Sequence, residues 1–516
     1  MMNNICRCCL LWLLALPSNN TNVLCQVKTY AAPRAEPSSK DYKVKAQGKE
    51  VFIYNARVSA YPINVWPGIN RPLEQTELAS FGYFDINGET TISIEKLSDT
   101  IHDVIIRPLS LKIKPFIKGN TISFKITKPC QVSIEVNGFH KALTLFANPV
   151  EKISVNKSSP HVLFFGPGIH HPGVIYARSN QLIYIAGGAI VYGLIYGHHV
   201  NNVKIMGRGI LDGSSFRRGV DSIALMQFEH CNNVLIDGVI LRNPHIFTVF
   251  PHESNKIVIN NIKIIGNWRY NTDGIDIVNS KNVLVKNSFI RSFDDGICIK
   301  GRVNSPWAEH DPAWDSVSQS NIKNVRVENC VVWSDWGRGL EIGAETVTDS
   351  ISNITFKNCD IIHFVHIALD IQNGNRAAIS DVTFEDIRIE DPILENVYLD
   401  DLDNPVKDVT LIKNSPGKTY KFTENEIGRL FEINIKDNGW QKDKSLGSIT
   451  NVYFRKINYT SSYRPKLFFE GHSAQHKISN IFFDDIIINN RSIQTLSGAN
   501  IIVNEFVENV KFNSCK

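Results

Sequence analysis

The chain has 516 residues, of which 43% are hydrophobic and 21% are charged, and its formal net charge at pH 7 is +4. This length exceeds the size at which one compact core stops growing, so we expect two domains or a repeat architecture. The ordinary composition and the small net charge give no indication of a nucleic acid partner.

The N-terminus has the pattern of a secretory signal peptide, which we assign to residues 1–25. One basic residue, Arg7, precedes an apolar run over residues 8–16 that is too short to span a bilayer. We therefore expect a secreted or periplasmic protein with no transmembrane segment. An outer-membrane lipoprotein anchored through Cys25 is the alternative, although the preceding residue, Leu24, is not small.

The cysteines after this leader show no close metal-ligand spacing, so we predict no metal site, no cofactor and no essential disulfide framework. They stand at Cys130, Cys231, Cys298, Cys330, Cys359 and Cys515.

Residues 41–155 form short β-like runs separated by turn residues, which predicts a small antiparallel β-sandwich. One such run, residues 131–136, ends at the Asn-Gly turn of residues 137–138. We interpret this domain as a cap on the N-terminal end of a solenoid, where unpaired strand edges would invite association. A carbohydrate-binding module is the alternative.

From residue 160 to residue 516 a short phrase recurs in which a polar residue precedes Val or Ile. The apolar residue falls at positions 203, 234, 257, 283, 325, 354, 382, 452, 481 and 510. This spacing indicates a solenoid with one coil per repeat, and we predict a parallel β-helix of about ten or more coils. Asn precedes the apolar residue in most coils, with Lys256 and Asp381 as exceptions, and stacked amides can hydrogen-bond along the axis.

Two turns of this solenoid carry acidic residues. Asp273 stands in an Asn-Thr-Asp-Gly turn, and the pair Asp294 and Asp295 stands in a Phe-Asp-Asp-Gly turn. One extended segment, residues 282–290, separates the turns, so we expect both at the same edge with their backbones ~4.7–4.9 Å apart.

Crowded carboxylates raise at least one pKa, which divides the set into an acid and a base. Cleavage of a glycosidic bond needs such a division. Two readings without catalysis stay open, namely a pair of turn-capping Asp residues and a calcium site.

The Asn-Thr-Asp-Gly of residues 271–274, followed by the Asp-Asp-Gly-Ile-Cys-Ile-Lys of residues 294–300, resembles the active-site signature of glycoside hydrolase family 28. This family contains the polygalacturonases and is related to the dextranase-type family 49. The resemblance covers roughly residues 160–516 and implies a right-handed parallel β-helix and an inverting hydrolase.

The resemblance also implies residue roles. Asp294 would be the general acid, and Asp273 and Asp295 would position the attacking water. Asn271 and Lys300 flank the three carboxylates as candidate substrate or orienting residues. Asp276 is a reserve base.

Two insertions interrupt the repeat. The first, residues 302–320, directly follows the Asp pair and carries Trp307 and Trp314, whose ring faces are suited to stack on sugars. The second, about residues 394–446, is polar, and we assign no site to it.

The chain departs from the polygalacturonase pattern in the two coils after the Asp pair. Where the family has Gly-His-Gly, this chain has Arg338 between two glycines, and where the family has Arg-Ile-Lys it has Ala368 and Asp370 around Leu369. An anion in place of a cation beside a bound uronate costs on the order of a few kcal/mol.

We therefore expect a neutral or differently decorated polysaccharide as the partner. Arg338, His245 and Trp336 are the residues that we place near the cleaved bond. We expect the protein to be a monomer.

Two other functions stay open. A pectate-lyase-like enzyme would use calcium and an arginine base, for which Arg291 and Arg338 are candidates. A β-helix that only binds polysaccharide would need no cluster of three carboxylates.

Overall fold

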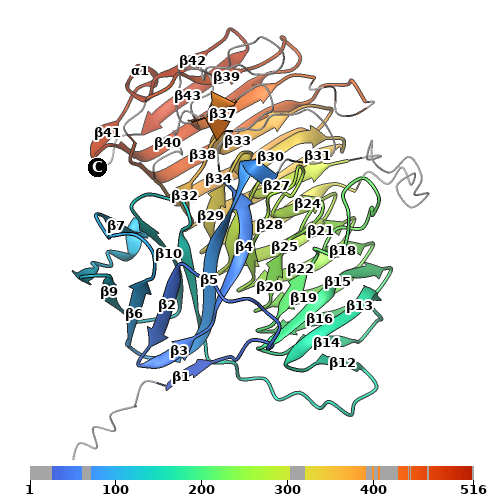
Figure 1. Ribbon diagram of the computed structural model, residues 1–516. Helices are drawn as coiled ribbons and strands as arrows, with labels where there is room; N and C mark the ends of the chain where they lie inside the picture. The colour runs from blue at the N-terminus through green and yellow to red at the C-terminus, as the bar shows by residue number, and fades with distance from the viewer. Residues whose placement is uncertain are drawn as a thin grey trace, which may run out of the picture.

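The computed structural model of the protein describes residues 26–60, 71, 73–302, 320–390, 398–399, 405–406 and 428–513, apart from 438, 440, 442, 462 and 463. Strands dominate these residues (Figure 1). The helical elements among them are short: η1 (Leu73–Gln75), η2 (Leu109–Leu111) and α1 (Leu496–Ala499). No helix in the described part of the chain is long and apolar enough to cross a membrane.

The N-terminal domain consists of two packed sheets, which confirms the predicted β-sandwich. One sheet has the order β1-β5-β11-β10-β7 with β4 beside β5, and the other has the order β3-β2-β6-β9-β8. Buried and exposed residues alternate along β2 and β6, as a sheet with one covered face requires. One pairing, between β11 and β5, is parallel. The strands are β1 (Gln26–Thr29), β2 (Tyr42–Ala46), β3 (Lys49–Val51), β4 (Ile53–Ser59), β5 (Thr76–Asn87), β6 (Thr90–Lys96), β7 (Val104–Arg107), β8 (Phe116–Lys118), β9 (Thr121–Ile126), β10 (Cys130–Val136) and β11 (Leu143–Pro149).

The rest of the described chain winds into the predicted right-handed parallel β-helix, whose strands stack in three rows (Figure 1). Two long strands, β13 (Gly168–Tyr176) and β15 (Ala189–His198), begin the second and third rows together.

The first row, here called the asparagine row, holds the recurring phrase. Its strands are β12 (Val162–Phe165), β14 (Leu182–Ile185), β16 (Asn201–Gly207), β19 (Asn232–Asp237), β22 (Asn255–Asn260), β25 (Lys281–Lys286), β28 (Ile322–Glu328), β31 (Ser350–Lys357), β34 (Ala378–Ile389), β38 (Ser448–Tyr459), β40 (Ile478–Ile488) and β43 (Val507–Asn513).

The second row faces the N-terminal domain and is called the domain-facing row. It continues from β15 through β17 (Ile210–Asp212), β20 (Ile240–Arg242), β23 (Lys263–Ile265), β26 (Phe289–Ser292), β29 (Val331–Ser334) and β32 (Asp360–His363).

The third row carries the acidic residues and is called the acidic row. It continues from β15 through β18 (Met226–Glu229), β21 (Val249–His252), β24 (Ile275–Val278), β27 (Ile297–Gly301), β30 (Arg338–Thr346), β33 (Ile367–Asn373), β37 (Arg429–Ile435), β39 (Leu467–Glu470) and β42 (Ile501–Val503). Outside the rows lie β35 (Tyr398–Leu399), β36 (Pro405–Val406) and β41 (Arg491–Ile493).

The recurring Asn residues form the predicted ladder in the asparagine row. Asn324 donates from Nδ2 to Asn282 Oδ1 at 2.8 Å and accepts from Asn353 Nδ2 at 2.8 Å. These residues are also left-handed, with φ of 59° at Asn324, a conformation that a side chain other than Asn or Asp rarely adopts. The exception Lys256 is left-handed as well, with φ of 57°, and its neighbour Asn255 makes the ladder hydrogen bonds in its place.

The interior of the β-helix is filled by the apolar residue of each coil stacked on its counterpart. Phenyl rings occupy successive coils of the asparagine row, with centroid separations of 4.9, 5.2, 5.0 and 4.5 Å along Phe356, Phe384, Phe454, Phe483 and Phe512. Three cysteines of the interior, Cys231, Cys330 and Cys359, are free and buried.

The N-terminal domain packs along the side of the β-helix, so the expected cap on its end is wrong. An apolar cluster joins Phe81 and Phe146 of the domain to Ile240 and Phe289 of the domain-facing row. The physical reason is that this row presents apolar side chains outward as well as inward, which leaves a stripe that must be covered.

Buried ion pairs fix the orientation of this interface. They join Arg107 Nη1 to Glu390 Oε2 at 2.5 Å, Arg208 Nε to Asp85 Oδ1 at 3.1 Å, and Arg242 Nη1 to Glu36 Oε1 at 2.6 Å.

The ladder predicts a measurable difference between two substitutions at Asn324. Asn324→Ala loses the two amide hydrogen bonds and replaces Asn, which tolerates the left-handed region, by a residue that rarely adopts it, so the free energy of unfolding should fall by about 2 kcal/mol or more. Asn324→Gly loses only the hydrogen bonds and should cost about 1 kcal/mol. Urea denaturation measures both, with the exposed neighbour Lys323→Ala as a control; equal losses for Ala and Gly would contradict the backbone part of this explanation.

Candidate active site

The acidic row owes its character to strand alternation. Its inward residues, such as Ile275, Ile297 and Leu340, belong to the core of the β-helix. The residues that follow them point to the other face and stack in register as Asp276, Cys298, Glu341, Asp370 and Glu432. Four carboxyl groups therefore share one column with a thiol.

The turns that lead into β24 and β27 add the three predicted carboxylates. The backbone N–H of Gly274 donates to the carbonyl oxygen of Asp295 at 2.8 Å, so the two turns stack directly, as the one-coil interval predicted. The next turn contributes Gly337, where a Cβ atom would lie 2.8 Å from Asp294 Oδ1. Glycine is required there because the turn also approaches the backbone of the Asp pair, where the added Cβ would lie 2.4 Å from the Asp294 carbonyl carbon and 2.5 Å from the Asp295 nitrogen.

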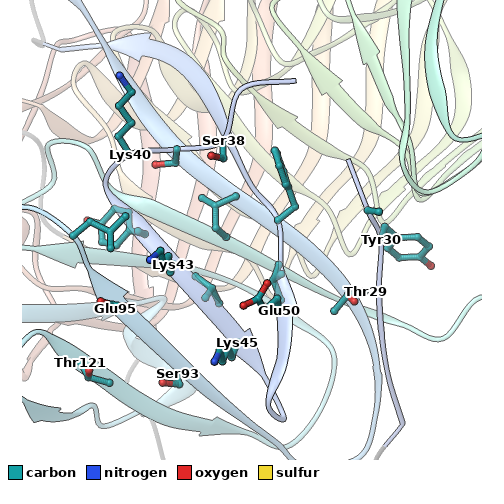
Figure 2. A pocket seen from close by; sticks show the side chains of 18 residues that line it. Thr29, Tyr30, Ser38, Lys40, Lys43, Lys45, Glu50, Ser93, Glu95 and Thr121 are labelled. Carbon is teal, nitrogen blue, oxygen red and sulfur yellow. The ribbon is translucent and has the colours of Figure 1, made fainter. Parts of the chain in front are cut away.

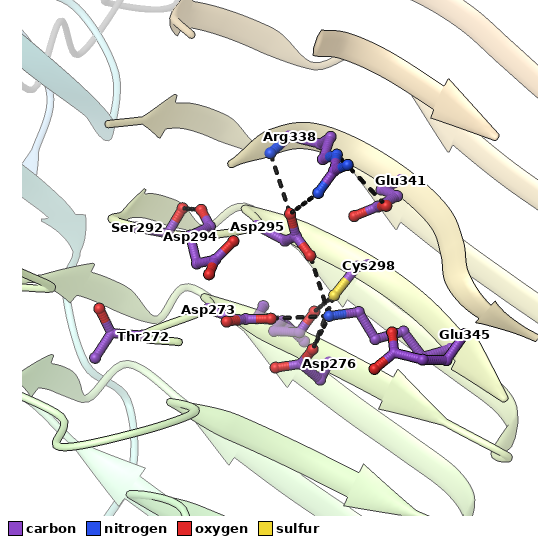
Figure 3. Close-up of polar contacts among 12 residues, drawn as sticks. Thr272, Asp273, Asp276, Ser292, Asp294, Asp295, Cys298, Arg338, Glu341 and Glu345 are labelled. Atoms are coloured by element: carbon purple, nitrogen blue, oxygen red, sulfur yellow. Dashed lines mark hydrogen bonds and ion pairs between the residues drawn. The ribbon is translucent and has the colours of Figure 1, made fainter. Parts of the chain in front are cut away.

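The ammonium group of Lys300 lies among the carboxylates. Its Nζ is 2.9 Å from Asp273 Oδ2, 3.1 Å from Asp276 Oδ1 and 3.0 Å from Asp295 Oδ2. All four side chains are buried. Lys300 donates hydrogen bonds to Asp273 and Asp295 and forms an ion pair with Asp276, which fits a positioning residue rather than a substrate contact. The carboxylates that it joins are drawn in Figure 3, where Cys298 also donates from Sγ to Asp276 Oδ1.

This arrangement separates the carboxyl groups by their pKa. Burial, together with the neighbouring Asp295, raises the pKa of Asp294 to about 7. Burial also acts to raise the pKa of Asp295, but Lys300 and Arg338 outweigh it and hold that pKa below its usual value. The pKa of Asp273 is raised well above its usual value by burial and by Asp276. Asp294 is therefore poised as an acid and Asp295 as a base.

Arg338 extends the network into the next coils. Its backbone N–H donates to Asp295 Oδ1 at 3.2 Å, and its Nε lies 3.4 Å from Asp370 Oδ2 and 3.8 Å from Glu341 Oε1. Gln372 donates to Asp370 at 2.8 Å. Burial raises the pKa of Asp370 to about 7 and raises that of Glu341 well above its usual value. Figure 3 shows Arg338 bridging Asp295 and Glu341.

The other predicted site residues are placed differently. Asn271, left-handed with φ of 55°, accepts a hydrogen bond from Arg218 in the turn that holds Asp273. His245 is buried with its Nε2 3.1 Å from the carbonyl oxygen of Asp221, and it has no contact with the three carboxylates among the described residues. Trp307 and Trp314 lie outside the described residues.

Trp336 forms part of a wall beside the Asp pair. Its ring stacks on Phe293 with centroids 5.7 Å apart and an interplanar angle of 18°. The guanidinium group of Arg71, a residue of the N-terminal domain, also lies over the Phe293 ring, 4.0 Å from its centroid. Arg71 donates to the carbonyl oxygen of Trp268 at 3.2 Å. The N-terminal domain thus supports the residue that directly precedes Asp294.

Sequence reasoning assigned no role to Glu341, Arg218 or Arg71. For Glu341 the signal would be its register with Cys298 of the recognised motif, but the insertion of residues 302–320 lies between the two coils and hides that spacing in the sequence. No local pattern indicates Arg218 or Arg71, since each reaches the site from a distant segment.

A hollow of about 960 Å³ opens elsewhere, on the N-terminal domain (Figure 2). Lys40, Lys43 and Lys45 line it, and Tyr30 at its edge donates its hydroxyl group to Asp85 at 2.8 Å. It lies apart from the acidic row and contains none of its carboxylates.

Comparison with known proteins shows what the β-helix is similar to. Residues 184–410 match the model for glycosyl hydrolases family 28. A polygalacturonase of Prunus persica is 25% identical over 228 residues, which cover 37% of this chain and 58% of the relative. An exopolygalacturonase of Arabidopsis thaliana is 27% identical over 183 residues, which cover 32% of this chain and 43% of the relative. The chain thus spans about half the length of the curated relatives it matches.

The solved structure of Dex49A from Penicillium minioluteum is similar over the whole architecture. It aligns with a TM-score of 0.52 and 14% sequence identity over 94% of this chain and 96% of that one. This similarity shows the fold, with both the N-terminal sheets and the β-helix.

We predict that removing the Lys300 ammonium group causes a pH-dependent loss of stability. Lys300→Met leaves Asp273, Asp276 and Asp295 buried without it and should lower the free energy of unfolding by about 3–5 kcal/mol near neutral pH. Without the cation the folded-state pKa values of the carboxyl groups rise, so the deficit should shrink as the pH falls from about 8 to about 5. Chemical denaturation at several pH values measures this, with the exposed Lys281→Met as a control. A deficit that is the same at every pH would contradict the electrostatic explanation.

Proposed function

We propose that this chain belongs to family 28 of the glycosyl hydrolases, whose model residues 184–410 match, and that it is a secreted enzyme that hydrolyses the glycosidic bonds of a polysaccharide. The observation that carries the proposal is the buried patch in which Asp294 and Asp295 are adjacent in sequence but have opposite pKa shifts. Secretion is proposed from the apolar segment at the N-terminus.

Asp294 is the proposed general acid. Its pKa of about 7 keeps a proton available near neutral pH for the leaving oxygen of the sugar. Asp295 is the proposed base, because Lys300 and Arg338 keep it ionised and able to take a proton from water. Asp273 has a raised pKa, so its role is to position the water rather than to deprotonate it. Inversion at the sugar is what the family resemblance implies.

A calcium-dependent lyase is less well supported. The Lys300 ammonium group lies within 3.1 Å of three carboxylates, the position that a bound cation would need. Arg291, the first candidate base, is fully buried and donates to both Asp335 oxygens at 3.1 and 3.2 Å. Arg338, the second, is held among Asp295, Glu341 and Asp370.

The charge of the patch supports a neutral substrate. Its described part holds the carboxyl groups of Asp273, Asp276, Asp294, Asp295, Glu341 and Asp370, and the cations that interact with them include Lys300, Arg338 and Arg218. A uronate carboxylate placed beside Asp370 would meet a like charge wherever that group is ionised. The relatives are named polygalacturonases, so substrate choice is where we propose that this chain differs from them.

Replacement of the proposed acid predicts a catalytic loss without a structural one. Asp294→Asn should lower kcat by about 10²–10⁴-fold while substrate binding and the unfolding midpoint change little. In the wild type, kcat/KM should fall as the pH rises through about 7, because Asp294 then loses its proton. Reducing-sugar release over a pH series measures both, and the exposed Asp349→Asn serves as control. Wild-type turnover by the Asp294 variant would reject the assignment.

A substrate panel tests the proposed specificity. Neutral dextran-type and galactan-type polymers should be cleaved faster than unsubstituted polygalacturonan, because Asp370 stands where the family carries a cation. Each assay is repeated with a chelator, and hydrolysis should persist. Rapid release of galacturonate would refute the neutral-substrate proposal, while a chelator-sensitive, ultraviolet-absorbing product would indicate a lyase.

A further inference from the structure

A second column of polar residues follows the strands of the acidic row at the opposite end from the Asp turns. Four successive coils place a left-handed residue there: His199, His230, Glu253 and Asn279, with φ of 51°, 50°, 45° and 42°. The backbone N–H of His199 donates to the carbonyl oxygen of Glu229, and that of His230 donates to the carbonyl oxygen of His252, each at 3.0 Å. These turns are therefore stacked one above another.

The turn conformation alone does not explain the two histidines. A left-handed position suits Gly or Asn, and Asn279 occupies it in the fourth coil. In the first two coils, His199 and His230 instead present imidazole rings that are stacked with centroids 4.7 Å apart. His198, at the end of β15, adds a third ring 4.2 Å from that of His199.

The ring nitrogens of these three residues converge. One nitrogen from each of His198, His199 and His230 lies within 4.8 Å of the others. Tetrahedral zinc with Zn–N distances of about 2.0–2.1 Å needs nitrogens about 3.4 Å apart. His198 and His199 are exposed, so rotation of their side chains is free to close this difference.

A buried carboxylate orients the third histidine. Glu253 Oε2 lies 3.0 Å from His230 Nδ1, and the Glu253 side chain is 2% exposed. A carboxylate on one ring nitrogen fixes the tautomer and leaves the other nitrogen available as a ligand, an arrangement that metal-binding histidines commonly have. This contact is independent of the clustering of the rings.

We propose that His198, His199 and His230 bind a divalent transition-metal ion, with Zn²⁺ as its representative, and that Glu253 is a positioning residue. Three imidazoles with a fourth position left to water form a recognised zinc donor set. The ion would tie the turn after β15 to the turn after β18.

The site is separate from the candidate active site. In strand register, His198 is followed by Glu229, His252, Val278 and Lys300, so four strand steps, or about 19 Å, separate it from Lys300. The proposal does not rest on the hydrolase proposal. A metal site differs from the expectation from sequence, which was that the protein has none. His230 lies one coil away from His198 and His199, so the spacing of the three residues matches no local metal motif.

Titration calorimetry of tag-free, chelator-treated protein with zinc chloride tests the site. One ion per chain should bind, and the melting temperature should rise with zinc concentration. His199→Asn and His230→Asn keep a residue suited to the left-handed turn, so each should fold normally and bind zinc at least about tenfold more weakly. The double variant should lose one-to-one binding, whereas the exposed His161→Asn should bind as the wild type does.

The result that overturns the proposal is a wild type without one-to-one zinc binding, or a double variant that binds zinc as tightly as the wild type. Glu253→Gln separates orientation from packing: zinc affinity should fall about tenfold while the melting temperature without zinc stays the same. An unchanged affinity would remove Glu253 from the site.

Discussion

In-register stacking of parallel strands is the constraint on which this molecule depends. Each side chain lies about 4.8 Å from its counterpart in the next coil, so a residue type that recurs in every coil is stacked on side chains of the same type. Amide side chains are stabilised by this stacking, since Asn324 donates to Asn282 and accepts from Asn353 along one line. Carboxylates do not, and the column from Asp276 to Glu432 would be strongly unfavourable if every member were charged.

The structure meets this cost by placing single cations beside several carboxyl groups. Lys300 joins three carboxylates, and Arg338 continues the network from Asp295 to Asp370. Because neither cation lies equally close to every carboxyl group, the pKa values spread in both directions. The same two side chains therefore stabilise the buried carboxylates and separate their pKa values as the proposed acid–base chemistry requires.

Most of the fold was predictable because the coils of a solenoid appear in the sequence as a regularly spaced repeat. The positions of Val203, Val234 and Val283 indicated the coils, and the distance from Asp273 to Asp294 placed two turns at one edge. The side-on docking of the N-terminal domain was not predictable, since Phe81 and Phe289 become neighbours only after both sheets exist. Glu341 is in register with Cys298, but an insertion between the two coils hides that spacing.

The contact of Arg71 with Phe293 means that the N-terminal domain cannot be exchanged independently of the β-helix. A domain joined only by a linker can be gained, lost or exchanged without consequence for its neighbour. Here a shared apolar cluster and three buried ion pairs join the two parts, and the Arg71 guanidinium group packs on Phe293, the residue next to the proposed acid. Recombination that separated the two parts would have to replace a wall of the candidate active site as well as part of the apolar core.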